Sequence, residues 1–311
     1  MSSFEFAMMN AYYNEHLKQF DRLAEAASLI DWEAFRPIIA SSYQNLTERG
    51  GRPNIDPIVM LKLLVLQQWY GLSDPELERQ TARDLIFQHF LGFPGTVPDF
   101  TTVWLFRERL IRNGKYEKVW SELQRQMSRS GFKVEKKGKA AQDATFITAD
   151  PGHAPMEPRG IQALTRRSRD GAWTKKLNRS YFGFKLHVKT DLKYGLIRAF
   201  ETTTASVHDS QVDLSRRGEV VYRDKGYFGV PSKGYNATMQ RGTRAGSIGI
   251  FDRMRNARIS RKRAPIERTF AVLKAGHVLV TTVPRARVKM LFSCLCFNLM
   301  QMLTLRKQAL A

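Results

Sequence analysis

The sequence predicts a mixed α/β protein in which an all-helical N-terminal domain precedes a sheet flanked by helices. Three observations predict this class. Residues 1–130 carry apolar residues at helical spacings, residues 140–229 contain short β-rich runs bounded by turn residues, and the chain returns to a helical pattern at Pro265. The glycine- and lysine-rich stretch SRSGFKVEKKGK separates the first two patterns. We therefore expect a helical domain over residues 1–130 and a second domain over residues 131–311.

Several helices are expected in the N-terminal domain. Residues 17–35 and the strongly apolar stretch from Asp56-Pro57 to Gly71 each predict a helix. Ser73 and Glu76 have the spacing of a capping box, which predicts another helix over residues 75–92. Residues 101–130 predict a basic, amphipathic helix pair. The helices on either side of the 71–74 turn form either a DNA-reading helix-turn-helix or a hairpin that packs or dimerises, and the low local charge favours the hairpin.

The second domain should contain the sheet. Strand-like runs are AAQDATFIT, YFGFKLHVKT, GLIRAFETTTA and GEVVYRDKGYFG. The polar, basic segment 149–180 between the first two runs is expected to be an insertion or loop. The apolar run over residues 288–305 approaches the length of a membrane span. Because Lys289, Asn298 and Gln301 interrupt it, we expect a buried core helix and no contact with a membrane.

Charge is distributed very unevenly along the chain. The formal net charge is +21 and the sequence pI is about 10.2, yet residues 1–130 hold 15 Lys/Arg against 16 Asp/Glu. Residues 131–311 hold the other 35 basic and 13 acidic residues. Such a basic field recruits a polyanion, most commonly nucleic acid. A merely solubilising surface is the alternative, and the self-repulsion of so many like charges argues against it.

Composition excludes several classes of protein. The 43% hydrophobic and 11% aromatic residues exclude a wholly disordered chain. The two cysteines, Cys294 and Cys296, lie in an apolar run, which excludes a disulfide scaffold and has no zinc-site spacing. The N-terminus lacks the basic start and unbroken apolar core of a signal peptide. These features predict a reducing, cytoplasmic location.

The basic residues occur in bursts that interleave with aromatic side chains. Trp173, Tyr181 and Phe182 lie among or beside them and could stack on unpaired bases. The candidate DNA contacts within these bursts are Lys175, Lys176, Arg258, Arg261 and Lys262.

Three acids stand out in this basic domain. Asp143 lies inside a strand-like run and shares a face with Thr145 and Ile147. Asp224 ends the strand EVVYRD, and Glu267 lies in what we expect to be the first turn of the helix APIERTFAVLKAG. Each alone is an ordinary strand-end or helix-start acid. Together, in a basic domain, they predict a cluster that a metal ion compensates.

The helix that bears Glu267 carries a second pattern. Arg263 precedes Glu267 by one turn and Lys274 follows it by two, so the three share nearly one face. A carboxylate between two cations suits a metal ion and a phosphate together. Two Mg²⁺ ions held by carboxylates would activate a water or 3′-OH and stabilise the leaving oxygen of a phosphodiester. Asp209, in SVHDSQ, is an alternative to Asp224 as the second acid of this cluster. Aspartate at the start of a likely helix is, however, also a normal N-cap.

These motifs have a recognisable order. They are GRPNIDPIVMLKLLVLQQWYGLSDPELERQTARDLIFQHFLG, PDFTTVWLFRERL, WTKK, YFGFKLHVKTD, TTASVHDS, VVYRDKGYFG and RAPIERTFAVLK. The chain resembles an IS5-type insertion-sequence transposase of the IS4-like DDE superfamily over almost its whole length. One departure is Ser260, which stands where the family's Arg-x3-Glu-x6-Lys pattern is usually preceded by Tyr.

The resemblance implies an RNase H-like catalytic domain, with a mixed sheet flanked by helices. It implies that Asp143, Asp224 and Glu267 are the catalytic metal ligands, in that order, for two Mg²⁺ ions that Mn²⁺ can replace. Arg263 and Lys274 would contact transposon-end DNA. The N-terminal domain would serve DNA binding or dimerisation. His208 is either a hydrogen-bond donor behind the site or simply a polar residue near it.

The leading function hypothesis is therefore a DNA transposase in a prokaryotic cytoplasm, associated with the nucleoid. It would bind double-stranded DNA at the inverted repeats, cleave it, and join 3′-OH ends to target DNA. Two ends need processing, which predicts at least a homodimer. The alternatives are a purely hydrolytic nuclease, a domesticated transposase that only binds DNA and, more distantly, a ribosome- or RNA-binding protein.

Overall fold

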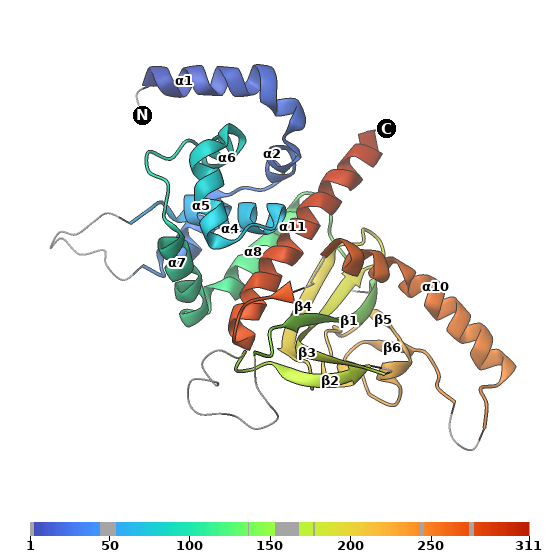
Figure 1. The fold of residues 1–311 in the computed structure, drawn as a ribbon. Helices are drawn as coiled ribbons and strands as arrows, with labels where there is room; N and C mark the ends of the chain where they lie inside the picture. Colours follow the sequence, from blue (N-terminus) through green and yellow to red (C-terminus); the bar gives the residue numbers. More distant parts are fainter. Residues whose placement is uncertain are drawn as a thin grey trace. The chain divides into compact units, whose positions relative to one another are not determined.

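A computed structural model describes residues 3–43, 54–135, 137–152, 168–176, 178–242, 246–273 and 277–310 (Figure 1). The chain divides into two compact units. The N-terminal unit comprises Met1–Gly131 together with Leu299–Ala311. The second unit comprises Phe132–Asn298, and we call it the catalytic unit because it contains the three acids that the resemblance implies are catalytic.

The N-terminal unit is helical in its described residues. Its helices are α1 (Ser3–Tyr12), α2 (Arg22–Ala27), α3 (Arg36–Ala40), α4 (Pro57–Tyr70), α5 (Asp74–Arg83), α6 (Leu85–Leu91), α7 (Phe100–Arg112) and α8 (Lys115–Arg129), with short turns η1 (Tyr13–Leu17), η2 (Lys18–Phe20) and η3 (Glu33–Phe35). The Asp56 carboxylate caps α4 by accepting a hydrogen bond from Ile58 N at 2.7 Å, and Gly71 ends the helix at a φ of 70°. The predicted helices at α4, α7 and α8 are confirmed.

Two predicted helices are shorter than expected, and both breaks occur at an aspartate. The helix expected over 17–35 is interrupted because Asp21 caps a new helix, accepting from Ala24 N at 2.8 Å. The helix expected over 75–92 divides into α5 and α6 because the Asp84 carboxylate accepts from Ile86 N at 2.8 Å. Aspartate side chains compete with the backbone in this way and so favour caps over helix interiors.

The catalytic unit is built on a mixed sheet. Its described strands are β1 (Lys139–Ala149), β2 (Ala172–Lys176), β3 (Arg179–Asp191), β4 (Ile197–Thr204), β5 (Val220–Arg223), β6 (Tyr235–Thr238) and β7 (His277–Val278). The order is β2-β3-β1-β5-β6, with β4 beside β3 and β7 beside β1. Strand β1 is antiparallel to β3 but parallel to β5, and β5 is parallel to β6. The short turn η4 (Asp209–Gln211) lies between β4 and β5, and the short turn η5 (Lys225–Tyr227) lies between β5 and β6.

The insertion expected over 149–180 is only partly a loop. Residues 172–176 form β2, which pairs antiparallel with the start of β3. Pairing with β3 satisfies the backbone groups of this polar segment, which its composition alone could not predict. Residues 153–167 of the insertion lie outside the described residues.

Helix α10 (Ile250–Leu273) packs on β1 and β5. The expected helix start at Pro265 was wrong, because Pro265 lies inside a helix that begins fifteen residues earlier. Ile259, Ile266 and Leu273 are buried at a seven-residue interval, and this stripe fixes the helix against the sheet. Glu267 therefore lies far from the helix N-terminus and gains nothing from the helix dipole.

Helix α11 (Val283–Leu310) contains the apolar C-terminal run. It is long and apolar enough to cross a membrane, but 72% of its most apolar window is buried inside the protein. Within the catalytic unit, its Asn298 exchanges two hydrogen bonds with the backbone of Ile197, at 2.8 and 3.0 Å. These features are those of a core helix, as the interrupting polar residues predicted.

Candidate active site

Asp143 and Asp224 are neighbours on the sheet. In the parallel pairing of β1 with β5, Ala141 lies opposite Tyr222. Continuing this register by two residues places Asp224 beside Asp143, with both side chains on the same face. Helix α10 lies on this face, since Arg263 of α10 reaches Asp143. The sheet thus brings together two of the three predicted acids.

Asp143 is held by two hydrogen bonds. Arg263 Nη2 donates to its Oδ2 at 2.7 Å, and the Ala144 backbone N–H donates to its Oδ1 at 2.9 Å. Burial raises the pKa of Asp143 to about 6, and the charges of Asp224 and Asp209 act in the same direction, against the opposing effect of Arg263. The buried Asp143 carboxylate therefore lies within electrostatic reach of two further acids, Asp224 and Asp209, as well as of Arg263.

Asp224 begins the turn η5 and shapes it. Its Oδ1 accepts a hydrogen bond from Gly226 N at 2.8 Å. A Cβ at position 226 would lie 3.0 Å from the same oxygen, closer than nearly all real Cβ contacts. Glycine at this position therefore lets the backbone approach the carboxylate and fixes where Asp224 points.

Buried side chains next to Asp224 hold the turn η5 in place. Arg223 is fully buried, and its guanidinium donates to Thr238 Oγ1 at 3.1 Å and to Val230 O at 3.0 Å. It also lies 5.3 Å from the ring centre of the buried Tyr227. Burial, followed by the charges of nearby acids including Asp209 and Asp143, raises the pKa of Tyr227. Arg223 before Asp224 and Tyr227 after it are thereby fixed in the core.

Asp209 lies near this pair but is engaged elsewhere. Lys185 Nζ forms an ion pair with Asp209 Oδ1 at 2.9 Å and also donates to Val207 O at 2.7 Å. The His208 side chain contacts a neighbouring residue in the chain, because its Nδ1 lies 2.7 Å from Ser210 Oγ. Asp209 thus has a lysine partner, as Asp143 has Arg263, whereas the described contact of the Asp224 carboxylate is the Gly226 N–H.

Glu267 is not gathered with the aspartates. It is exposed on α10, one turn beyond Arg263, and makes no hydrogen bond or ion pair with any described residue. Over the described part of the chain, no three His, Cys, Asp or Glu side chains form a group that could hold a metal ion. Lys274, the cation expected two turns further, lies outside the described residues.

Comparison with known proteins places the chain in a family. A model described as "Transposase DDE domain" matches residues 135–299, and one described as "Transposase domain (DUF772)" matches residues 11–109. The chain belongs to the DDE transposase family. The mixed sheet with surrounding helices fits the RNase H-like fold of that family, which confirms the predicted fold class.

One solved structure also matches this transposase weakly. It is described as "Cryo-EM structure of piggyBac transposase synaptic complex with hairpin DNA". The match has a TM-score of 0.42 and 11% sequence identity, and it covers 90% of this chain and 72% of that chain. A likeness at this level supports no conclusion.

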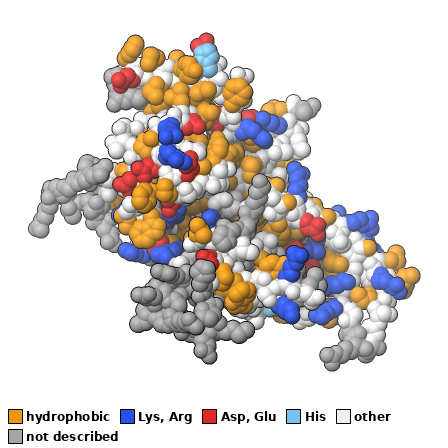
Figure 2. Space-filling model, in the orientation of Figure 1, with side chains coloured by type: hydrophobic (Ala, Val, Ile, Leu, Met, Phe, Trp, Pro, Cys, Tyr) orange, Lys and Arg blue, Asp and Glu red, His pale blue; other side chains and the backbone are white. Residues whose placement is uncertain are grey.

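The basic side chains of the transposase gather over the catalytic unit. Figure 2 shows Lys and Arg side chains over the surface formed by α10 and the strands beside it. Arg258, Arg261 and Lys262 are exposed on α10, and Lys175 is exposed on β2. The side chain of Lys176 lies outside the described residues.

The chemistry of the two aspartates fits a divalent cation. Carboxylate oxygens are the ligands that Mg²⁺ prefers. Burial, and to a smaller extent the charges of Asp224 and Asp209, raise the pKa of Asp143, and a bound cation would stabilise its ionised form. Members of the DDE transposase family generally use divalent metal ions. Asp143 and Asp224 are therefore the candidate ligands for such an ion, and Arg263 orients the Asp143 carboxylate.

The sequence did not reveal the side chains that position the aspartates. Arg223 and Lys185 read as ordinary strand residues, and only the pairing of strands puts them behind Asp224 and beside Asp209. A weak signal existed, since a charged residue within an otherwise apolar strand must find a buried partner.

Proposed function

We propose that this chain is the transposase of an IS5-type insertion sequence, within the IS4-like superfamily. It binds the terminal inverted repeats of its element, cleaves the DNA, and joins the freed 3′-OH ends to target DNA. The observation that carries the proposal is the juxtaposition of Asp143 and Asp224 on one sheet face, with Arg263 of α10 bound to Asp143 at 2.7 Å. An acid pair of this kind in a strongly basic unit suits phosphodiester chemistry.

In this proposal, Asp143, Asp224 and Glu267 hold two Mg²⁺ ions, for which Mn²⁺ can substitute. The bound ions would neutralise the phosphate charge and activate a water or 3′-OH. Arg263 and the Ala144 N–H hold the Asp143 carboxylate in place. Glu267 lies one turn from Arg263 on an exposed surface, where no described residue restrains its side chain from rotating.

DNA would be bound mainly by the basic surface. The proposed contacts are Lys175, Lys176, Arg258, Arg261, Lys262, Arg263 and Lys274. Residues 1–130 would contribute DNA binding or dimerisation, and at least two protomers would act together because an element has two ends. The proposed location is the cytoplasm of a prokaryote, in association with the nucleoid.

The proposal is tested by strand transfer of a labelled transposon end into plasmid DNA in Mg²⁺ or Mn²⁺. Asp143→Asn, Asp224→Asn and Glu267→Gln should each reduce cleavage and joining by several orders of magnitude, because each removes a proposed metal ligand. Asp170→Asn is the matched control, since its side chain accepts a hydrogen bond from Val283 N, which asparagine can also accept. That variant should retain wild-type activity.

Four results would change the assignment. Wild-type activity in Glu267→Gln would remove Glu267 from the ligand set, and loss of activity in Asp209→Asn, with Asp224→Asn active, would replace Asp224 by Asp209. Cleavage without any joined product would favour a hydrolytic nuclease. Binding of the ends without cleavage would identify a domesticated protein.

A further inference from the structure

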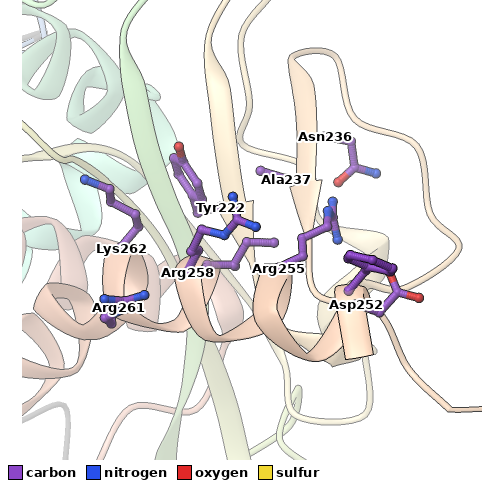
Figure 3. A pocket seen from close by; sticks show the side chains of 10 residues that line it. Tyr222, Asn236, Ala237, Asp252, Arg255, Arg258, Arg261 and Lys262 are labelled. Atoms are coloured by element: carbon purple, nitrogen blue, oxygen red, sulfur yellow. The ribbon is translucent and has the colours of Figure 1, made fainter. Parts of the chain in front are cut away.

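The catalytic unit contains a large hollow beside the proposed active site. It has a volume of about 920 Å³ and lies between α10 and the strands β5 and β6 (Figure 3). Figure 3 shows Arg255 and Arg258 extending from the helix toward the strands that carry Tyr222 and Asn236. The volume is at the upper end of the range for sites that enclose a small organic ligand.

The hollow has cations that the described residues do not neutralise. Arg258, Arg261 and Lys262 line it, are exposed, and form no ion pair with any described residue. Arg255, in contrast, is fixed because it donates to Thr238 O at 2.7 Å. Asp252 is the acid in the lining, so positive charge dominates. This lining attracts an anion.

The cations also lead toward the aspartates. Arg255, Arg258 and Lys262 are spaced by three and four residues, which aligns them along one side of α10. The next residue, Arg263, is the one bound to Asp143. Arg261 and Lys262 also line a second hollow of about 560 Å³, so the basic surface continues along the helix.

Aromatic surface makes up another part of the wall. Phe251 is 83% exposed, although it lines the hollow, and Tyr222 of β5 faces α10 on the sheet side. Phe251 and Tyr222 together give the hollow two aromatic surfaces on which a planar, apolar face of a ligand can stack. Phosphates of a closed duplex offer no such face, whereas an unpaired base does.

We propose that this hollow holds an unpaired nucleotide of the DNA substrate. The base stacks on Phe251 or Tyr222, and the adjoining phosphates bind Arg258, Arg261 and Lys262. The inference rests on the proposed function, since it names the form of DNA that approaches the same acids. An acidic protein segment would satisfy the cations but would leave the aromatic wall uncovered, so DNA is favoured.

The test compares two fluorescent DNA probes by anisotropy, using the full chain in EDTA so that no cleavage occurs. One probe is a blunt duplex, and the other is the same duplex with a single-stranded overhang of about four nucleotides. The wild-type protein should prefer the overhang probe. Phe251→Ala should weaken overhang binding by about 5- to 150-fold and leave blunt-duplex binding unchanged, because it removes a stacking surface.

Arg258→Gln should act differently. It removes a phosphate contact, so the slope of log K against log salt on the overhang probe should fall by about 0.7. Phe251→Ala should leave that slope unchanged. Met254→Ala and Arg253→Gln are matched controls, because both residues are exposed on α10 and neither lines the hollow. Both should bind the two probes with the wild-type preference for the overhang.

Two results would overturn the inference. These are equal wild-type affinity for both probes, and losses in Phe251→Ala that are equal for both probes. Either result, with duplex binding and strand transfer intact, would leave the proposed function standing. Absence of binding to any DNA, together with absence of strand transfer, would reject the proposed function itself.

Discussion

The two units of this transposase differ in how deeply their ion pairs are buried. In the N-terminal unit, the Arg79–Glu76 pair on the surface of α5 has side chains 59% and 25% exposed, and Arg107–Asp74, which joins α7 to α5, has side chains 24% and 25% exposed. In the catalytic unit, Lys189 Nζ binds Glu219 Oε1 at 2.7 Å between elements, with side chains only 1% and 10% exposed. The catalytic unit therefore has charged side chains in its interior as well as on its surface.

This difference determines how much the stability of each unit depends on its ion pairs. Exposed pairs contribute little because water and salt screen them. A buried pair stabilises little in total, but removal of one partner leaves an uncompensated charge in the core. The Arg198–Asp191 pair at 2.7 Å follows the same pattern, and Asp191 Oδ1 also accepts from Tyr194 N at 2.6 Å. Buried pairs of this kind fix the positions of strands and turns, so the catalytic unit should tolerate charge substitutions poorly.

The largest expected effect tests this contrast directly. Lys189→Met should lower the free energy of unfolding by about 3–5 kcal/mol, because Glu219 would remain charged in the core. Burial lowers the pKa of Lys189, while the hydrogen bond with Glu219 opposes that shift. Urea unfolding followed by tryptophan fluorescence measures the change.

A second variant separates lost charge balance from lost packing. Adding Glu219→Gln to Lys189→Met removes the leftover charge, while the amide oxygen can still accept from Arg216 N, as the carboxylate does at 2.5 Å. The double variant should recover most of the loss. A double variant as unstable as Lys189→Met alone would show that packing, and not charge, decides stability here.

The next effect concerns pH. Burial lowers the pKa of His187 to about 4, whereas an unfolded histidine titrates near 6.5. The stability from the neutral, buried ring is fully present above pH 6.5 and is lost as pH falls toward 4. We expect this residue to account for a loss of about 3 kcal/mol over that window.

His187→Gln should flatten the pH dependence between pH 6.5 and 4, measured by urea unfolding across that range. His16→Gln is the control, because His16 is exposed in the N-terminal unit and its loss should leave the profile unchanged. An unchanged slope in His187→Gln would assign acid sensitivity to other groups.

A smaller effect compares one glycine from each unit. A Cβ at Gly226 would lie 3.0 Å from Asp224 Oδ1, whereas a Cβ at Gly95 would meet nothing within 4 Å. Gly226→Ala should reduce the cleavage rate by about tenfold, since a displacement of about 1 Å at a reacting group costs about 100-fold. Gly95→Ala should retain full activity. Equal activity of both variants would mean that the Asp224 turn adapts without cost.

Much of the fold could be predicted from local signals. Asp56 and Gly71 mark the ends of α4, and each does so through a contact made within the helix itself. Predictions failed where a tertiary contact outweighed the local pattern. Pro265 read as a helix start, but the buried Ile259 and Ile266 on either side of it hold one helix against the sheet. The strand β2 likewise exists because β3 pairs with it.

The candidate site could be predicted only in part, for the same reason. The strand pattern placed Asp143 inside one strand and Asp224 at the end of another, and only the pairing of β1 with β5 brings the two onto one face. The hollow beside them combines Tyr222 with Phe251 and Arg258 from a distant segment. The residue spacing within each segment does not indicate that the two segments lie side by side in the folded protein. The role of Glu267 stays a prediction, because its exposed side chain is not oriented by any described neighbour.

The smallest expected effect completes the contrast between the units. Arg79→Gln should change the free energy of unfolding by about 0.2–0.5 kcal/mol, since Arg79 lies on the surface of α5 and Gln80 Nε2 still donates to Glu76 Oε1 at 2.7 Å. In about 1 M salt, where the Debye length is about 3 Å, even this difference should vanish, whereas the loss in Lys189→Met should persist. A loss in Arg79→Gln that rivals that of Lys189→Met would contradict the contrast, because burial would then not be what makes a charge costly to remove.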